Sequence, residues 1–232
     1  MNFGLLDNPI WFALETVQRD FAVRNALAQC YPSEMIQFGA MEHPTPEGLA
    51  AFAQLLEHQT ALVWFTPLEI EAFPNCLELV MKLSISQMIC QNLNPTPTLE
   101  MRELNLHDVP AMLELVNLTK PGPFSARSIE LGKFWGVHRN GALVAMAGER
   151  LRLTGFTEVS GVCTHPDYRG QGLARALMAR VSEQIFARGE TPFLHVMGSN
   201  TGAVKVYEQL GFKWRKKIFG YVLKAKSSEV KS

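Results

Sequence analysis

A short basic segment from Arg169 to Gly172, with the sequence RGQG, has the composition of a phosphate-binding loop. Before it, residues 157–164 alternate with β-branched side chains, which predicts a strand. After it, apolar residues recur at helical spacing over 173–185, and Gly189 stands where a helix C-cap would. The first N–H groups of a helix have no internal partner, and glycine leaves that backbone open. The junction therefore predicts a binding site for an anion such as a diphosphate.

Two readings of this junction stay open, a binding loop and an ordinary strand–helix turn. Arg169 and Arg175 would add positive charge to a binding loop. Two other phosphate motifs are excluded. The segment has no Gly-Lys-Ser/Thr of a nucleoside-triphosphate loop, and Arg175 stands where a dinucleotide fingerprint has its third glycine.

The segment from Val162 to Ala174, VCTHPDYRGQGLA, resembles the acetyl-CoA-binding signature of the GNAT superfamily of N-acetyltransferases. That signature, Gln/Arg-x-x-Gly-x-Gly/Ala, is met by Arg169, Gly172 and Ala174. Downstream, Ser199-Asn200 and the segment 206–212 (VYEQLGF) resemble the second motif of the same superfamily. The resemblance covers about residues 98 to 225.

The resemblance implies an α/β fold, a mixed sheet flanked by helices, in which acetyl-CoA binds where two adjacent parallel strands diverge. Those strands would be 157–164 and 192–197. Backbone groups of three residues would meet the pantetheine arm, and the loop and first helical turn would take the diphosphate. The implied cofactor-binding residues are Val162, Cys163, Thr164, Arg169, Gly170, Gln171, Gly172, Leu173, Ala174, Arg175 and Asn200, with no metal.

Tyr207 matches the tyrosine that protonates the CoA thiolate in this superfamily. A phenol with a pKa of ~10 is a suitable proton donor for a thiolate of comparable basicity. The alternative is a plain aromatic residue packing beside Val204 and Leu210. Asn200 matches a position that contacts the cofactor, but it would serve equally well as a helix N-cap.

Two residues compete as the general base. Glu158 shares a strand face with Ser160 and Val162 by the period of two, and its offset from Thr164 matches a glutamate of related acyltransferases. His195 lies on the next predicted strand, where ribosomal-protein N-acetyltransferases place a glutamate. A histidine on an apolar strand is more often structural, so the sequence favours Glu158.

Composition narrows the function classes. The chain has 232 residues, 47% of them hydrophobic, and 22 basic against 22 acidic residues, which gives no electrostatic case for nucleic acid or an anionic membrane. The basic cluster 213–217 is interpreted as a solvated edge strand. No apolar run reaches membrane-spanning length, and the N-terminus does not resemble a signal peptide. The cysteines lack metal-ligand spacing and are expected to be buried, reduced thiols of a cytoplasmic protein: Cys30, Cys76, Cys90 and Cys163.

Proline residues at 95 and 97 predict a linker between residues 1–95 and a GNAT domain at 96–232. In the first part, helices are expected at 8–28 and 47–57 and strands at 33–41, 61–65 and 77–90. This smaller α/β domain could be a degenerate copy of the GNAT fold, as in glycine N-acyltransferase relatives. In the second part, we expect strand 99–104, helix 108–118, a short helix ending at 131, a hairpin at 134–151, strand 192–197, helix 201–210 and a last strand near 217–224.

The predicted function is acetyl transfer from acetyl-CoA to a primary amine of a small molecule or amino acid. A protein or peptide N-terminal acetyltransferase is the first alternative, and a non-catalytic acyl-CoA sensor is the second. A further hypothesis places Lys120, Phe124 and Arg127 beside the acceptor, where the two cations would suit a carboxylate. A solvated basic loop is an equal alternative.

Overall fold

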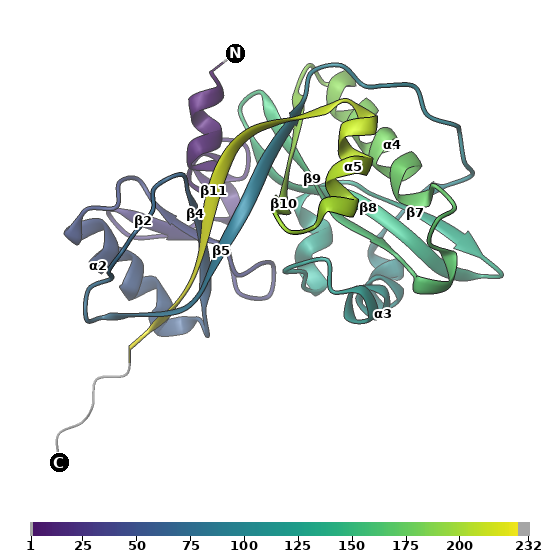
Figure 1. The fold of residues 1–232 in the computed structure, drawn as a ribbon. Coiled ribbons are helices and arrows are strands. Elements are labelled where there is room, and N and C mark those ends of the chain that lie inside the picture. Colours follow the sequence, from purple (N-terminus) through teal and green to yellow (C-terminus); the bar gives the residue numbers. More distant parts are fainter. Residues whose placement is uncertain (1, 227–232) are drawn as a thin grey trace. The chain divides into compact units, whose positions relative to one another are not determined.

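The structure, a computed structural model, describes residues 2–226 (Figure 1). By internal contacts the chain divides into two compact units. Unit 1 comprises Met1–Ser33, Gln37–Ile85 and Lys217–Ser232, and unit 2 comprises Glu34–Ile36 and Ser86–Lys216. Units defined by contacts and domains defined by sequence are different divisions, so the boundary expected between residues 95 and 96 stays a prediction.

Unit 1 combines short helices with a small antiparallel sheet of strand order β1-β2-β3. Its strand β4 pairs antiparallel with the C-terminal part of β11 (Phe212–Ala225), from Phe219↔Thr66 to Leu223↔Leu62. The elements of unit 1 are η1 (Phe3–Asp7), α1 (Pro9–Glu15), η2 (Arg19–Phe21), β1 (Val23–Arg24), β2 (Ala28–Cys30), β3 (Gly39–Met41), α2 (Pro46–Leu55), η3 (Leu56–His58) and β4 (Leu62–Thr66).

The first helix is shorter than the sequence predicts. It ends at Glu15 rather than near residue 28, and the Thr16 hydroxyl donates to the Phe12 carbonyl at 2.5 Å as the chain leaves the helical conformation. Val17, expected on the buried face, is 47% exposed. The strand expected at 33–41 is formed only at Gly39–Met41. Helix α2 confirms its predicted cap, since the Thr45 hydroxyl accepts from the Gly48 N–H at 3.1 Å.

Unit 2 has the expected order of elements. They are β6 (Arg102–Glu103), η4 (Leu106–Asp108), α3 (Val109–Thr119), η5 (Ala126–Leu131), β7 (Phe134–Arg139), β8 (Ala142–Leu153), β9 (Phe156–Thr164), η6 (Pro166–Tyr168), α4 (Leu173–Ala187), β10 (Thr191–Met197) and α5 (Thr201–Leu210). Strands β5 (Leu77–Cys90) and β11 (Phe212–Ala225) contribute residues to both units. The strand order in unit 2 is β11-β5-β10-β9-β8-β7-β6.

Helices cover both faces of this mixed sheet (Figure 1). On one face, α4 packs against β7–β10 through Leu177, Val181 and Ile185, and α5 adds Leu210 to the same core. On the other face, α3 contributes Met112 and Val116 to a second core. The predicted α/β class, a mixed sheet flanked by helices, is confirmed.

The local turn chemistry follows the sequence closely. Asn140 and Gly141 both have positive φ, 51° and 81°, as a two-residue turn between antiparallel strands requires. Gly189, just after α4, also has a left-handed backbone, with φ of 74°. Strand β6 is shorter than expected, with only Arg102 and Glu103 in regular pairing.

The expectations about the outer surface are met only in part. The basic residues at 213–217 belong to β11, and β4 pairs with this strand only from Phe219 to Leu223, outside these residues. Of the four cysteines, Cys76 is exposed, while the other three are buried. Within residues 2–226 no helix is both long and apolar enough to cross a membrane. The same residues contain no cluster of His, Cys, Asp or Glu that could hold a metal ion.

Candidate functional site: an opening between β9 and β10

The parallel strands β9 and β10 pair only at their beginnings. The register runs from Thr191↔Phe156 to Phe193↔Glu158, whereas β9 continues to Thr164 and β10 to Met197. A bulge in β9 accompanies this divergence, because its pairing with β8 shifts between Met146↔Cys163 and Gly148↔Ser160. Gly161, inside the bulge, has φ of 61°, and a Cβ there would lie 2.9 Å from Phe134. The two strands predicted to diverge therefore do so.

The bulge also corrects the expected faces of β9. Val162 was expected beside Glu158 and Ser160, but it packs on the α4 side with Val159. Ser160 lines a pocket with Arg150, the partner of Glu158. One extra residue in a strand reverses the alternation beyond it.

The loop after β9 is open at the positions where a phosphate would need space. Gly170 and Gly172 have φ of 76° and 74°, and a Cβ built on either glycine would meet nothing within 4 Å. Gly172 is the N-cap of α4 and supplies no side chain to the first-turn N–H groups. These backbone donors together with the helix dipole suit an anion.

Two buried polar atoms near this loop also fit a polar ligand. Thr164 Oγ1 and Arg175 Nε have no hydrogen-bond partner within the described part of the chain, although the Arg175 guanidinium donates to the Pro95 carbonyl through Nη2 at 3.3 Å. Arg169, Gln171 and Gly172 are exposed. The residues present therefore fit the diphosphate and pantetheine arm of acetyl-CoA.

Two of the predicted cofactor-binding residues, Leu173 and Cys163, have buried side chains. Leu173 is 3% exposed and belongs to the core under α4, so only its backbone is available to a ligand. Cys163 is buried on the α3 side, and burial raises the pKa of its thiol to about 12. It is therefore a neutral thiol, and its predicted role remains a backbone contact.

Helix α5 carries the two other predicted residues. The Asn200 side chain accepts from the Ala203 N–H at 3.2 Å, so its capping role is confirmed and its cofactor contact stays a prediction. Tyr207 is half-buried against the α4-side core, and burial raises the pKa of its phenol. This phenol therefore stays protonated throughout the neutral range.

Glu158 and His195 are brought together as a buried pair. Glu158 Oε1 accepts from His195 Nδ1 at 2.7 Å, and Arg150 donates to both carboxylate oxygens at 2.8 and 2.6 Å. The exposed fractions of the Glu158 and His195 side chains are 0% and 3%. Burial alone would raise the pKa of Glu158, but the charge of Arg150 and the two hydrogen-bond partners lower it to about 2.

Both ring nitrogens of His195 have hydrogen-bond partners. Arg215 has only donors, so Gln87 faces it with its carbonyl oxygen, at 2.7 Å. The Gln87 amide nitrogen then faces His195 Nε2 at 2.9 Å, and His195 Nδ1 donates to Glu158.

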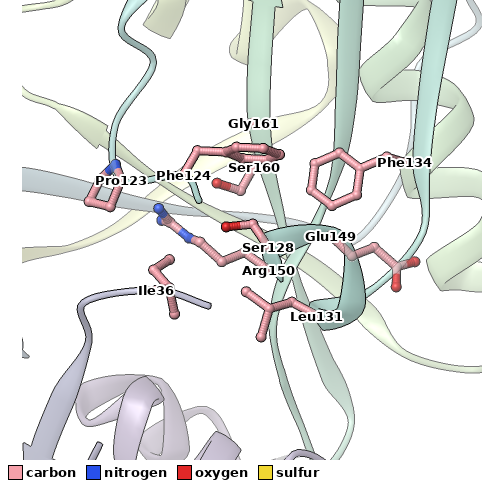
Figure 2. A pocket seen from close by; sticks show the side chains of 10 residues that line it. All are labelled: Ile36, Pro123, Phe124, Ser128, Leu131, Phe134, Glu149, Arg150, Ser160 and Gly161. Atoms are coloured by element: carbon pink, nitrogen blue, oxygen red, sulfur yellow. The ribbon is translucent and has the colours of Figure 1, made fainter. Parts of the chain in front are cut away.

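A small pocket of about 10 Å³, with room for about one water molecule, lies on the Glu158 side of β9 (Figure 2). Its lining is mostly apolar, with hydroxyl groups of two serines and the side chains of Glu149 and Arg150. Ser160 and Gly161 bring the bulge of β9 to its wall. The lining residues are Ile36, Pro123, Phe124, Ser128, Leu131, Phe134, Glu149, Arg150, Ser160 and Gly161.

Comparisons with known proteins agree with this geometry. A model of the family described as FR47-like protein matches residues 135–219. A solved GNAT-family structure from Novosphingobium aromaticivorans DSM 12444 is 33% identical over 96% of this chain and 99% of its own, with a TM-score of 0.86. The chain belongs to the GNAT family.

More distant relatives extend the comparison. A GCN5-related N-acetyltransferase from Kribbella flavida has the same fold, with a TM-score of 0.63, 15% identity, and coverage of 98% of this chain and 96% of its own. The [ribosomal protein bS18]-alanine N-acetyltransferase of Escherichia coli K12 is 37% identical over 75 residues, which are 32% of this chain and 50% of that protein. The chain thus spans about half the length of the curated relatives it matches.

Several residues of this GNAT site were missed by sequence reasoning. Arg150, Gln87 and Arg215 complete the buried Glu158–His195 network. A hairpin centred on Thr154-Gly155 would have placed Arg150 close to Glu158, so this one partner had a detectable signal. Gln87 and Arg215 had none.

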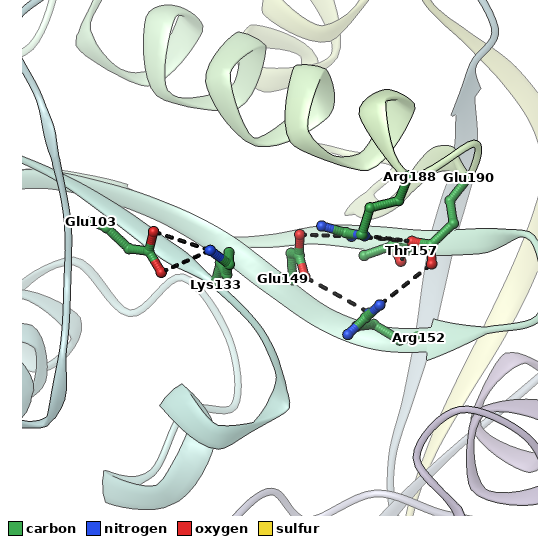
Figure 3. Close-up of polar contacts among 7 residues, drawn as sticks. All are labelled: Glu103, Lys133, Glu149, Arg152, Thr157, Arg188 and Glu190. Atoms are coloured by element: carbon green, nitrogen blue, oxygen red, sulfur yellow. Dashed lines mark hydrogen bonds and ion pairs between the residues drawn. The ribbon is translucent and has the colours of Figure 1, made fainter.

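A second polar cluster lies where α4 leads into β10, and it is structural (Figure 3). Buried Glu149 accepts from Arg188 at 2.8 Å and also lies 3.9 Å from Arg152. Glu190 accepts from the Thr157 hydroxyl at 2.6 Å and pairs with Arg188 at 3.1 Å. These contacts tie the end of α4 and the start of β10 to β8 and β9.

The loop residues proposed to bind an acceptor carboxylate are arranged differently from that hypothesis. Arg127 donates to Glu130 at 2.7 and 2.8 Å and to Glu34 at 2.9 Å, so its charge is already matched. Lys120 is exposed, at the left-handed C-cap of α3. Phe124 lines the pocket and contacts Phe134 edge to face at 5.6 Å. We retain only Phe124 as an acceptor-side residue.

The glycine loop gives the first testable prediction. Gly172→Ala should weaken acetyl-CoA binding measured by calorimetry at least tenfold, because a methyl group would enter the space proposed for the diphosphate and the residue would be strained at its positive φ. Gly189→Ala is the matched control, because Gly189 has the same φ of 74° and an equally open Cβ position. Both variants should lose ~1 kcal/mol of stability. Equal affinity in the two variants would place the cofactor elsewhere.

Proposed function

We propose that this GNAT-family chain is an N-acetyltransferase that moves the acetyl group of acetyl-CoA directly to a primary amine of a small molecule. One observation carries the proposal. Three features of the site lie along β9 and the loop after it. The strand diverges from β10, its bulge lines the pocket, and the loop leads into the start of α4, where no side chain caps the N–H groups. A thioester held along β9 would therefore be open to an amine on the Glu158 side of the strand.

Bound acetyl-CoA would supply an acetyl group activated as a thioester. The first-turn N–H groups of α4 and the backbone of 170–175 would hold its diphosphate, and the free edge of β9 at 162–164 would hold the pantetheine arm. In the reaction, the C–N bond to the amine forms as the C–S bond breaks. The attacking nitrogen would release one proton to solvent, and Tyr207 would donate its phenolic proton to the departing sulfur and regain one from solvent.

The acid–base assignment for the amine follows from pKa values. The charge of Arg150 holds the pKa of Glu158 well below its usual range, so this carboxylate is a poor proton acceptor for a lysine-like ammonium with a pKa of ~10.4. Both nitrogens of His195 are also engaged. We therefore propose that the amine reaches the site as its free base, and that Glu158 and His195 position β9 and β10 rather than take the proton. The expectation from the sequence that Glu158 or His195 is the general base stays a prediction.

This proposal predicts a pH profile set by the acceptor. The free-amine fraction rises with pH, so kcat/KM should rise with a midpoint near ~8 for an α-amino acceptor and near ~10.4 for an alkylamine. Thiol release from acetyl-CoA measures both profiles. A midpoint that is the same for both amines would show that a group of the enzyme titrates instead.

A protein N-terminal acetyltransferase is the second candidate. It rests on the similarity to the bS18-alanine N-acetyltransferase over 75 residues. The same thiol-release measurement, made with an amine panel and with peptides of varied N-terminus, separates the two. Acetyl-CoA binding without thiol release from any acceptor would leave a non-catalytic acyl-CoA sensor, which contradicts both.

A further inference from the structure

The first half of β5, which belongs to unit 1, has a neighbouring strand on one side only. Strand β11 runs beside it (Figure 1), and β10 is the other neighbour of β5 in the sheet. However, β10 has seven residues against fourteen in β5, and the contact between Gln87 and His195 places them beside the second half of β5. Within residues 2–226, one edge of β5 at 78–82 is therefore without a paired strand.

This segment is also exposed on both faces. A strand usually alternates between buried and exposed residues, whereas all five residues at 78–82 are exposed. Leu79, Val80 and Met81 are large apolar residues with exposed fractions of 42%, 44% and 53%. Consecutive apolar side chains on an unpaired edge form a surface suited to pairing with another strand.

The end strands of the sheet are protected against such pairing, as is usual for sheet edges. In unit 1, all five residues of β4 are buried. In unit 2, β6 has only two residues, and both are charged. Burial, shortness and charge all keep an edge from pairing with another molecule. The first half of β5 is longer and apolar at its centre, so it lacks this protection.

The sequence of the segment is complementary to itself. When two copies of residues 77–83, LELVMKL, run antiparallel with Val80 opposite Val80, Glu78 of each copy lies opposite Lys82 of the other. The remaining apolar residues then lie opposite one another. A parallel pair in the same register would place like charges opposite each other, and an antiparallel shift of two residues would remove both ion pairs. The charges therefore select a second copy of this chain in one register.

Lys82 is positioned for such a pair. Its ammonium donates to the Glu69 carboxylate and lies 4.9 Å from the centre of the Phe219 ring, which holds the side chain on one face of β5. An ammonium has three donors, so Lys82 can bind a second carboxylate without releasing Glu69. Glu78 is exposed on the same face, four residues before Lys82.

We propose that two copies of this chain pair through the first half of β5, antiparallel about a twofold axis at Val80. The N–H and C=O groups of the free edge form the ladder between the copies. Two Glu78–Lys82 ion pairs set its direction and register, and Leu79 and Met81 supply apolar contact. This inference concerns unit 1 and does not depend on acetyl transfer.

Charge reversal tests the pairing. Light scattering over a series of concentrations should show the unaltered chain passing from 25.9 kDa to about 52 kDa, twice that mass. Glu78→Lys and Lys82→Glu each place like charges opposite one another twice, so either variant alone should dimerise about tenfold more weakly. A 1:1 mixture of the two variants should regain the dimer, because the mixed pair again matches each charge with its opposite.

A disulfide tests the register. In a Cys76→Ser background, Val80→Cys would bring two thiols together at a Cα separation of ~4.5–5.5 Å, within the range of a disulfide. Mild oxidation should then give a covalent dimer on a non-reducing gel. Ser84→Cys in the same background is the matched control, because Ser84 is also exposed on β5 but lies opposite residue 76 in this register. The other three cysteines are buried.

Three outcomes would overturn the proposal. A chain that keeps a mass of 25.9 kDa at every concentration would leave this edge to a strand of a different protein. A dimer that is equally strong in both charge variants would form through another surface. Equal cross-linking of Val80→Cys and Ser84→Cys would exclude the register centred on Val80.

Discussion

Glu158→Gln should destabilise the protein by about 3–5 kcal/mol, a large share of the stability of a typical domain. The substitution leaves the Arg150 side chain, which is only 12% exposed, facing a neutral amide. Its His195 partner also loses the anion that receives the Nδ1 proton. Urea unfolding followed by circular dichroism measures the change.

Glu130→Gln is the control for this measurement. Glu130 also receives two hydrogen bonds from one arginine, Arg127, but this pair is on the surface, with side chains 35% and 42% exposed. Removing a surface ion pair costs less than ~1 kcal/mol. A similar loss in both variants would mean that burial does not strengthen the Arg150–Glu158 pair.

The pH dependence of stability provides an independent check. The pKa of Glu158 falls from 4.5 to about 2 on folding, so its stabilising effect is present above the unfolded-state pKa of 4.5 and is lost as pH falls through about 2. This shift corresponds to about 3 kcal/mol. The stability of the unaltered protein should therefore fall by about that much more than that of Glu158→Gln between pH 5 and pH 2.

The activity of a double variant decides whether Glu158 positions the strands or acts as the general base. Arg150→Gln/Glu158→Gln removes both charges and should regain most of the lost stability. If Glu158 only positions β9 and β10, kcat should return with the stability. If Glu158 is the base, kcat should stay ~10²–10⁴-fold low in a folded protein that still binds acetyl-CoA.

The parts of this protein that sequence predicts well are those fixed by local chemistry. Gly170 and Gly172 stand where the chain needs positive φ before α4, and Asn140-Gly141 specifies the turn between β7 and β8. Such signals need only a few neighbouring residues. Helical and strand periodicities predicted the elements of unit 2 in the same way, whereas the opening between β9 and β10 was implied by the resemblance to GNAT acetyltransferases.

The parts that sequence does not predict depend on distant pairing. His195 and Gln87 are 108 positions apart, and their contact requires β5 to lie beside β10 in the sheet. The bulge at Gly161 reverses which face Val162 occupies, and a simple period of two does not show this reversal. The contribution of Ile36 to the pocket likewise needs a fold in which residues 34–36 contact η5.

Tyr207→Phe should lower kcat by ~10²–10⁴-fold with little change in stability. Burial raises the pKa of the phenol, so Tyr207 is protonated at neutral pH, and its activity as an acid should be lost only as pH rises through that raised pKa. Phenylalanine keeps the ring that packs on the α4-side core and removes only the proton donor. Single-turnover measurements of thiol release with acetyl-CoA report the chemical step directly.

Tyr168→Phe is the matched control, because Tyr168 is also a half-buried tyrosine packed against the same core, but it lies on η6. Its loss of hydroxyl should leave kcat nearly unchanged. A loss of activity as large in Tyr168→Phe as in Tyr207→Phe would contradict a specific acid at Tyr207.

A change of leaving group tests the role itself. With p-nitrophenyl acetate as donor, the departing phenolate is stable without a proton, so the rate of acetyl transfer should be the same in Tyr207→Phe and in the unaltered chain. A residue that merely supports α5 would slow both donors equally. A deficit with acetyl-CoA that disappears with the activated ester therefore identifies proton donation to sulfur as the function of Tyr207, and a deficit that persists with both donors assigns it to packing.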